Sequence, residues 1–259
     1  SFTAGFLTTC GLKVAGAPCE YEGTFYGLHG NLSHIPAEEV SAVIEENGDS
    51  PCAVMKGKVR DAVIFGDKMC LEREIRCSYK ERKITLKDRV TNEGFKRVRQ
   101  MILYHCNIGY PVLSPDSEIF IPALETKARN VHAQEGIDSW MKVQEADADY
   151  EEMCYYHKLK PDEKNHSVAA VYNPDLDLGI AIEIDLSTLD HFVQWKMMGA
   201  GDYVMGLEPS NSTIDGIDDA VKNGSMKYLE PGETREYTLT FHILKGRKEF
   251  EKLKKRTEK

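Results

Sequence analysis

Three consecutive segments decide the fold: Cys52-Ala-Val-Met-Lys-Gly-Lys-Val-Arg60, Met69-Cys-Leu-Glu-Arg-Glu-Ile-Arg-Cys-Ser-Tyr79 and Lys83-Ile-Thr-Leu-Lys-Asp-Arg-Val-Thr91. Apolar and polar residues partly alternate in each of them, which is the pattern of a half-buried β-strand. Gly66-Asp67 and Lys80-Glu81 separate the segments with polar, turn-forming residues. The sequence therefore predicts an antiparallel meander of three strands.

The rest of the chain repeats this pattern with few helical signals. Further strands are predicted over residues 101–105, 167–172, 178–185, 192–197, 203–208 and 235–244. Residues 36–40 fit one helical turn, and residues 247–259 fit a short polar helix or a frayed tail. Many strands with turn signals and almost no helices indicate an all-β, mainly antiparallel sandwich.

Composition limits the classes of function. The chain has 259 residues, 41% of them hydrophobic, with a net charge of -9. Its acidity argues against nucleic acid as a partner, because phosphate neutralisation needs clustered Lys and Arg. No run approaches the roughly 18 apolar residues of a membrane span, so no membrane partner is expected. Seven cysteines without CxxC spacing favour reduced thiols and a cytoplasmic location.

Three short segments each place one ionisable side chain among glycines, aromatics or prolines: Leu28-His29-Gly30-Asn31, Tyr104-His105-Cys106-Asn107 and Gly206-Leu207-Glu208-Pro209. Two imidazoles and a carboxylate are suited to proton transfer near neutral pH. The chain also offers flat rings and hydroxyls for a sugar, in Tyr26, Tyr104, Tyr110, Trp195 and Tyr203. The residues therefore indicate carbohydrate chemistry.

A metal site is a competing interpretation of the same residues. His29, His105, His157 and Glu208 together would be an acceptable ligand set for zinc or manganese. All four come from distant segments, so their spacing does not decide between a metal site and direct proton transfer. We expect no metal and no cofactor. The acidic stretch at residues 145–152 is most simply a solvated loop, because it lacks the glycine and closing glutamate of a calcium loop.

Several of these strings resemble one known superfamily, the galactose mutarotases or aldose 1-epimerases. Leu28-His29-Gly30 is similar to their Leu-His-Gly segment, and Asp88-Arg89-Val90-Thr91-Asn92-Glu93-Gly94 to their Asp-x-Val-Thr-Asn-x-Gly turn. Tyr104-His105-Cys106-Asn107 resembles their His-x-x-x-Asn region, with Asn two residues after His instead of four. The strings that resemble a bacterial subgroup of aldose 1-epimerase family proteins run from Leu7 to Asn211 and include Tyr155-Tyr156-His157 and Gln194-Trp195-Lys196-Met197.

The resemblance implies a fold, a reaction and a set of roles. The fold would be the galactose mutarotase-like β-supersandwich, as a single domain over residues 1–259 without some N-terminal strands that the subgroup carries. The reaction would interconvert sugar anomers by ring opening, with Glu208 as base, His105 as acid and His29 as a donor to the sugar. The mutarotases also carry an arginine ahead of their first active-site histidine, and no matching arginine precedes His29.

The remaining predicted site residues would bind the sugar. Trp195 would stack on its apolar face, and Tyr104, Gln194, Asn107 and Asn211 would bond its hydroxyls. Lys196 and His157 are candidates to hold an anionic substituent of the substrate.

Two other classes remain open: a non-catalytic carbohydrate-binding or sugar-sensing module, and an isomerase or lyase acting on uronates. In the lyase, Tyr104, Tyr155 or Tyr156 would transfer protons. The sugar itself and the oligomeric state are not specified by the sequence.

Overall fold

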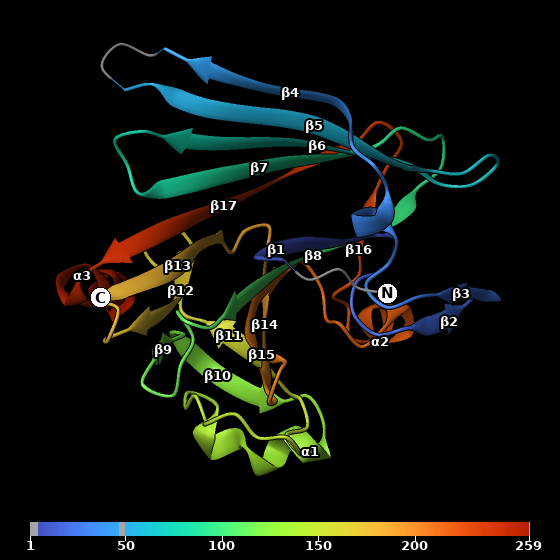
Figure 1. Cartoon of the computed structure of the whole chain (residues 1–259). Coiled ribbons are helices and arrows are strands. Elements are labelled where there is room, and N and C mark those ends of the chain that lie inside the picture. The colour runs from blue at the N-terminus through green and yellow to red at the C-terminus, as the bar shows by residue number, and fades with distance from the viewer. Residues whose placement is uncertain (1–4, 47–49, 259) are drawn as a thin grey trace. The chain divides into compact units, whose positions relative to one another are not determined.

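The computed structural model describes residues 5–46 and 50–258 (Figure 1). The chain divides into two compact units, of which the first holds mainly residues 8–104 and 210–240 and the second mainly residues 105–209 and 241–259. Four strands have residues in both units: β1 (Leu7–Leu12), β8 (Val98–Gly109), β15 (Tyr203–Ser210) and β17 (Thr234–Lys245). One supersandwich domain over residues 1–259 stays a prediction.

The first unit contains the predicted meander. Its strands follow the order β4-β5-β6-β7-β17, and β8 pairs with β1 and β16. The remaining elements of this unit are β1 (Leu7–Leu12), β2 (Cys19–Tyr21), β3 (Thr24–Tyr26), η1 (Leu32–His34), β4 (Glu38–Glu45), β5 (Cys52–Ala62), β6 (Lys68–Ser78), β7 (Lys83–Asn92), α2 (Ile217–Lys222) and β16 (Lys227–Leu229).

The antiparallel meander β5-β6-β7 is confirmed, with continuous pairing from Cys52↔Ser78 to Ala62↔Lys68 and from Met69↔Asn92 to Cys77↔Ile84. The helical turn predicted at residues 36–40 is wrong, because β4 begins at Glu38 and pairs with β5. Pairing with a neighbouring strand outweighs the weak helical preference of a short Ala-Glu-Glu sequence.

The second unit holds two antiparallel groups of strands. One follows the order β15-β14-β11-β10 and the other β17-β13-β12-β9. The elements of this unit are β9 (Glu118–Phe120), β10 (Ala123–Ala128), α1 (Val131–Glu135), η2 (Ile137–Ser139), β11 (Met153–Leu159), β12 (His166–Asn173), β13 (Leu178–Asp185), β14 (His191–Met198) and α3 (Arg247–Glu258). The predicted strands after residue 160 are all present, and the basic C-terminal segment is helical.

The helix α3 covers one hydrophobic core of the second unit (Figure 1). Phe250 and Leu253 of α3 pack with buried residues of β12 and β13, including Tyr172 and Ala181. The rings of Phe250 and Tyr172 stack with centroids 5.0 Å apart. None of the helices in residues 5–46 and 50–258 is long and apolar enough to cross a membrane.

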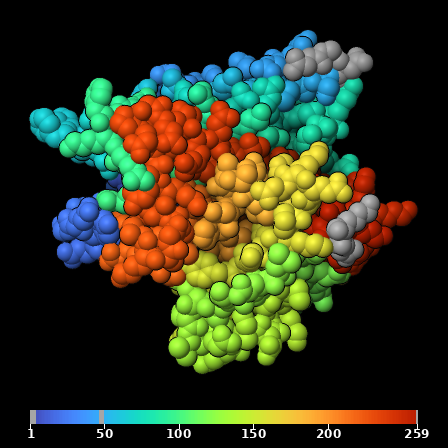
Figure 2. Space-filling model, turned by 180° about the vertical axis from the view of Figure 1, so that it is seen from behind, coloured from blue at the N-terminus to red at the C-terminus, as the bar shows by residue number. Residues whose placement is uncertain are grey.

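One connection in the second unit is long and carries two short helices. It spans residues 129–152, between β10 and β11, and includes α1 and η2. Asn130 caps α1, because its Oδ1 accepts from the backbone N–H of Ala133 at 2.8 Å. The connection lies at the surface of the second unit, at the bottom of the view in Figure 2. We call residues 129–152 the β10–β11 connection.

Candidate functional site

Two of the predicted catalytic side chains meet within the second unit. Nε2 of His105 on β8 lies 3.1 Å from Oε1 of Glu208 on β15. Both residues are buried, with exposed fractions of 4% and 1%. Among the described residues Glu208 Oε1 accepts no well-aligned hydrogen bond, so the two groups are close enough for an ion pair but are not aligned as a hydrogen bond.

Burial raises the pKa of Glu208 to about 8. The charge of Arg129 lowers the pKa and that of Glu152 raises it, but both effects are smaller than that of burial. A carboxyl group pays a large desolvation cost on ionising in such a place. Glu208 is therefore mostly protonated at pH 7 and can exchange a proton near neutral pH, as a general acid or base requires.

Local sequence shapes the position of Glu208. A Cβ atom built at Gly206 would lie 2.1 Å from Glu208 Oε1 and 3.2 Å from Trp195 Cβ, so the carboxyl group occupies space that only glycine leaves. Pro209 follows directly and restricts Glu208 to extended backbone. The Gly-Leu-Glu-Pro string therefore provides both the strand conformation and the room for the carboxyl group.

Trp195 lies beside this pair. Its ring centroid is 5.4 Å from that of His105, with an interplanar angle of 67° that makes the contact edge-on. The indole Nε1 donates to Oε2 of Glu152 at 2.7 Å. Trp195 is half-buried, and it pairs with Cys154 of β11. We call the sheet face that carries His105, Glu208 and Trp195 the front face.

Gln194 and Lys196 lie on the opposite face of the same sheet, which we call the back face. Successive side chains of a strand point to opposite faces, so the two neighbours of Trp195 cannot share its face. Gln194 pairs with Tyr155, and His157 lies two residues along β11 from Tyr155. The three predicted sugar ligands Gln194, Lys196 and His157 are thus separated from Glu208 by the sheet itself.

The back-face side chains bond the protein's own groups. Lys196 Nζ donates to the carbonyl oxygens of Ser139 at 3.2 Å and Lys142 at 2.8 Å, and burial lowers its pKa to about 8. Gln194 Nε2 donates to the Trp140 carbonyl at 3.0 Å. These contacts lie under the β10–β11 connection and favour a structural role.

His157 is held as a neutral imidazole. Its Nε2 lies 3.1 Å from Gln194 Oε1 and therefore donates, which leaves Nδ1 to accept from Thr126 Oγ1 at 3.0 Å. Burial lowers its pKa to about 4. The ring is one wall of a concavity of about 320 Å³ that also includes Asp190 and His191. His157 is therefore not suited to bind an anionic substituent near neutral pH.

Asn107 lies two residues beyond His105 on β8. Its Nδ2 donates to the Gly5 carbonyl at 2.8 Å, and its backbone N–H donates to the Phe6 carbonyl at 2.8 Å. Its Oδ1 is buried and has no hydrogen-bond partner among the described residues. The amide therefore anchors the segment before β1, and a sugar contact at Asn107 stays a prediction.

Tyr104 is buried in the first unit. Its hydroxyl donates to Asp88 Oδ2 at 2.9 Å, and Arg73 donates to both oxygens of the same carboxylate at 2.8 and 2.6 Å. Tyr104 has an exposed fraction of 0%, and its position favours a structural role over the predicted sugar contact.

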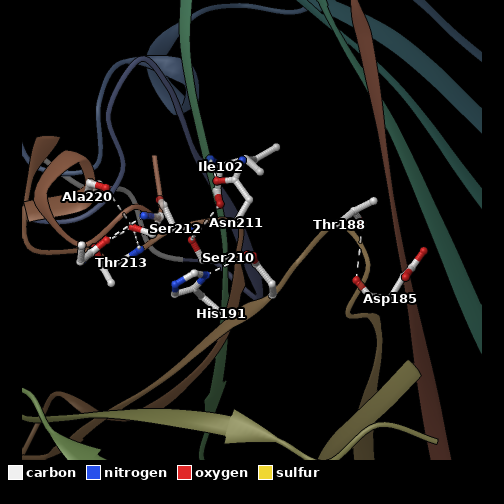
Figure 3. Close-up of polar contacts among 12 residues, drawn as sticks. Ile102, Asp185, Thr188, His191, Ser210, Asn211, Ser212, Thr213 and Ala220 are labelled. Atoms are coloured by element: carbon white, nitrogen blue, oxygen red, sulfur yellow. Dashed lines mark hydrogen bonds and ion pairs between the residues drawn. The ribbon is translucent and has the colours of Figure 1, made fainter. Parts of the chain in front are cut away.

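Asn211 is also buried in the first unit (Figure 3). Its Oδ1 accepts from the Ile102 N–H at 2.9 Å, and its Nδ2 donates to Gln100 Oε1 at 2.8 Å. Ser210 Oγ donates to the Ile102 carbonyl at 3.0 Å beside it. The amide is thus used to join the chain after β15 to β8, and the predicted sugar contact is not supported.

His29 belongs to the first unit. Its φ of 61° places it in the left-handed region, and its Nδ1 accepts from the Gly16 N–H at 3.3 Å. The next residue, Gly30, lies so close to Gly11 that an added Cβ would be 2.6 Å from the Gly11 carbonyl oxygen. A non-glycine residue in this conformation costs about 1–3 kcal/mol and is typical of functional or tightly constrained sites. The catalytic role of His29 stays a prediction.

The sequence did not point to Glu152 or Arg129. Glu152 ends the acidic stretch interpreted as a solvated loop, and no motif distinguishes it from Glu151 beside it. Arg129 donates its backbone N–H to the Cys154 carbonyl at 3.0 Å, next to Trp195 in the sheet. Both charges act on Glu208 because the strand pairing brings residues 129, 152 and 154 together, which no local pattern encodes.

Within the described ranges no group of three or more His, Cys, Asp or Glu side chains is gathered as for a metal ion, and His157 lies across the sheet from His105 and Glu208.

The first unit has a concavity of about 560 Å³ over β5, β6 and β7. Cross-strand charges line it as pairs, such as Lys58–Glu72 at 3.4 Å and Arg89–Glu236 at 3.3 Å. Neither sign of charge is in excess there, so the surface is not suited to attract a strongly charged ligand.

Comparison with solved structures identifies the class of fold. A structure from Klebsiella pneumoniae described as a "putative aldose 1-epimerase" superposes with a TM-score of 0.93 at 25% identity, covering 98% of the present chain and 66% of that chain. A galactose mutarotase-like protein from Clostridium acetobutylicum matches with a TM-score of 0.65 at 12% identity, over 93% and 79% of the two chains. Galactose 1-epimerase from Lactobacillus acidophilus matches with a TM-score of 0.60 at 10% identity, over 92% and 79%.

The fold is therefore the galactose mutarotase-like one, as the sequence predicted, and it is a fold of carbohydrate-related proteins. The chain belongs to the family described as a domain of unknown function, DUF4432, whose model matches residues 1–243. It spans less than two thirds of the Klebsiella chain. A comparison with curated proteins finds no match.

Proposed function

We propose that this protein is an aldose 1-epimerase-like isomerase that interconverts the anomers of a sugar by acid/base-catalysed ring opening. The observation that carries the proposal is the buried pair of His105 and Glu208, 3.1 Å apart beside the half-buried ring of Trp195. The likeness to the structure described as a "putative aldose 1-epimerase" and to galactose 1-epimerase supports the same reaction.

In the proposed reaction Glu208 removes one proton from the sugar and His105 gives one proton to it, so the two transfers balance. The Glu208 carboxylate removes the proton of the anomeric hydroxyl while protonated His105 gives a proton to the ring oxygen, so the bond from the anomeric carbon to the ring oxygen breaks and a carbonyl forms. Rotation of the carbonyl carbon and the reverse transfers close the ring to the other anomer. His29 is a further proposed donor to the sugar, and Trp195 would offer its ring face. General acid/base catalysis of this kind contributes about 10² to 10⁴ in rate.

The other two classes lead to different expectations. A binding module would hold the sugar without needing the proton transfers of Glu208. A uronate lyase that uses Tyr104 or Tyr155 is disfavoured by their pKa values: burial raises that of Tyr155 to about 12 and that of Tyr104 well above its usual range. Neither phenol is suited to lose a proton near neutral pH.

Exchange between the α- and β-anomer signals in NMR tests the proposal on a panel of neutral, acidic and phosphorylated aldoses. We expect the native protein to accelerate exchange for at least one sugar, and Glu208→Gln and His105→Ala to lose about 10²-fold or more of that rate. Glu163→Gln and His132→Ala, outside the site, are the matched controls and should retain it. Sugar binding without acceleration for every sugar would reject the enzyme in favour of the binding module.

A further inference from the structure

Three consecutive side chains of β14 bond the same long connection. Gln194 and Lys196 donate to the carbonyls of Trp140, Ser139 and Lys142, all near the middle of the β10–β11 connection. Between them, Trp195 donates its indole N–H to Glu152, the last residue of that connection. Because alternate residues of a strand face opposite sides, the connection is held from the back face and from the front face at once.

Glu152 therefore has a defined position although its side chain is exposed. Lys196 and Gln194 fix the middle of the connection from the back face, and Glu152 directly precedes Met153, the first residue of β11. The Glu152 carboxylate meets the indole N–H at 2.7 Å, the distance of a charge-assisted hydrogen bond. The position of the Trp195 ring is thereby restricted at its Nε1 edge.

The Trp195 ring links Glu152 to the His105–Glu208 pair, because it contacts both the Glu152 carboxylate and the His105 ring. It lies edge-on to His105 with ring centroids 5.4 Å apart, and its Cβ borders the space over Gly206 that Glu208 occupies. Loss of the Glu152 contact would leave the indole free to turn about its side-chain bonds. His105 would then lose a packing wall on the front face.

We propose that Glu152 is a positioning residue for the His105–Glu208 pair, holding the Trp195 indole edge-on against the His105 ring through its hydrogen bond to Nε1. The kinetic part of this inference rests on the proposed function, whereas the placement of Trp195 does not.

Glu152 also affects the pKa of the Glu208 carboxyl group. The ionisable groups around the Glu208 carboxyl are His105 on β8, Cys154 on β11, and Arg129 and Glu152 at the two ends of the connection. The negative charge of Glu152 raises the pKa of Glu208. Removing that charge should lower this pKa, since the ionised form of Glu208 is then less disfavoured.

The test uses two variants that separate the hydrogen bond from the charge. Glu152→Gln keeps an oxygen that accepts from the indole but removes the charge, whereas Glu152→Ala removes both. Each is made in the full chain carrying Trp140→Phe, so that Trp195 is the one remaining tryptophan of the two in the sequence. Glu151→Ala, which changes the neighbouring exposed carboxylate, is the matched control.

Two readouts need no activity. Fluorescence emission and anisotropy of Trp195 should change in Glu152→Ala, which frees the indole, and stay as in the parent in Glu152→Gln and Glu151→Ala. A carbon-13 NMR titration of the Glu208 carboxyl, assigned with Glu208→Gln, should give a lower pKa in both Glu152 variants. Unchanged Trp195 emission and anisotropy in Glu152→Ala would overturn the positioning role, whatever the kinetics show.

The kinetic readout links the inference to the reaction. If a sugar is turned over, Glu152→Ala should lower kcat by about tenfold with little change in KM, and Glu152→Gln should recover most of that loss. An equal loss of kcat in Glu152→Gln and Glu152→Ala would assign the effect to the charge of Glu152 and not to its hydrogen bond with Trp195, and would overturn the proposal. If no sugar is turned over, the proposed function fails, and the Trp195 measurements still decide whether Glu152 positions the ring.

Discussion

Nε2 of His105 lies 3.1 Å from Oε1 of Glu208, and the carboxyl group rests over the bare Cα of Gly206. The imidazole and the carboxyl group are thus both buried on the front face, within the distance of an ion pair. Burial is the main cause that raises the pKa of Glu208, and the charges of Arg129 and Glu152 have smaller effects.

The first prediction concerns the pH dependence of anomer exchange. Burial raises the pKa of Glu208 to about 8, so its base form is lost as pH falls below that value. We expect the rate to decrease with falling pH below about 8 by up to tenfold for each pH unit. NMR exchange measured from pH 5 to 8.5 checks this, and a decrease that begins only near pH 4.5 would contradict the role of Glu208 as base.

The second prediction is that Glu208→Gln stabilises the protein at alkaline pH. The pKa of Glu208 is higher in the folded than in the unfolded state, so its contribution to stability is complete below the unfolded pKa of about 4.3 and is lost as pH rises toward 8. The variant should gain about 1–3 kcal/mol over the native protein at pH 8 and little at pH 4.5. Urea unfolding at both pH values measures this, with Glu163→Gln as the exposed control.

The third prediction concerns Gly206. Gly206→Ala should displace the Glu208 carboxyl, because the new Cβ would lie 2.1 Å from Oε1. We expect kcat to fall by about 10²-fold, since a small misplacement of a reacting group has effects of this size. Gly109→Ala is the matched control in the same unit, where the added Cβ would lie 3.6 Å from the Tyr203 carbonyl oxygen, an ordinary van der Waals distance. Equal activity in the two variants would contradict the assigned position of Glu208.

The fourth prediction concerns Lys196, which was a candidate anion ligand. Lys196→Met should leave the Ser139 and Lys142 carbonyls without their donor and lower the free energy of unfolding by about 1–3 kcal/mol. The pKa of Lys196 is about 8 in the folded state and about 10.4 when unfolded, so native stability should gain from this residue as pH rises between those values. The variant should lack that gain, and the exposed Lys158→Met should keep it.

The fifth prediction separates a structural from a ligand role for Tyr104. Tyr104→Phe removes a hydrogen bond to the buried Asp88 carboxylate and should cost about 1–3 kcal/mol in unfolding free energy. Sugar affinity, measured by NMR titration at a temperature where both proteins are folded, should be unchanged. A large loss of affinity with unchanged stability would restore Tyr104 as a sugar ligand.

Strand positions could be predicted from the sequence because alternation is a local signal. The meander from Cys52 to Asn92 was recognisable since its turns are short and polar. The strand β4 was missed because its residues are nearly all exposed, so that Val40, Val43 and Ile44 give no inward pattern.

By itself, the amino-acid sequence determined the all-β class and the strand periodicity, since both depend on local patterns, and its short motifs suggested candidates for the acid and the base. Trp195, Gln194 and Lys196 were all predicted to bind sugar, but the structure places Trp195 on the front face and the other two on the back face. Only the tertiary structure decided that Glu208 meets His105, that His157 faces away from them and that Glu152 holds Trp195. Those relations depend on strand register and on the path of a long connection, which are set by burial and hydrogen bonding between residues far apart in the chain.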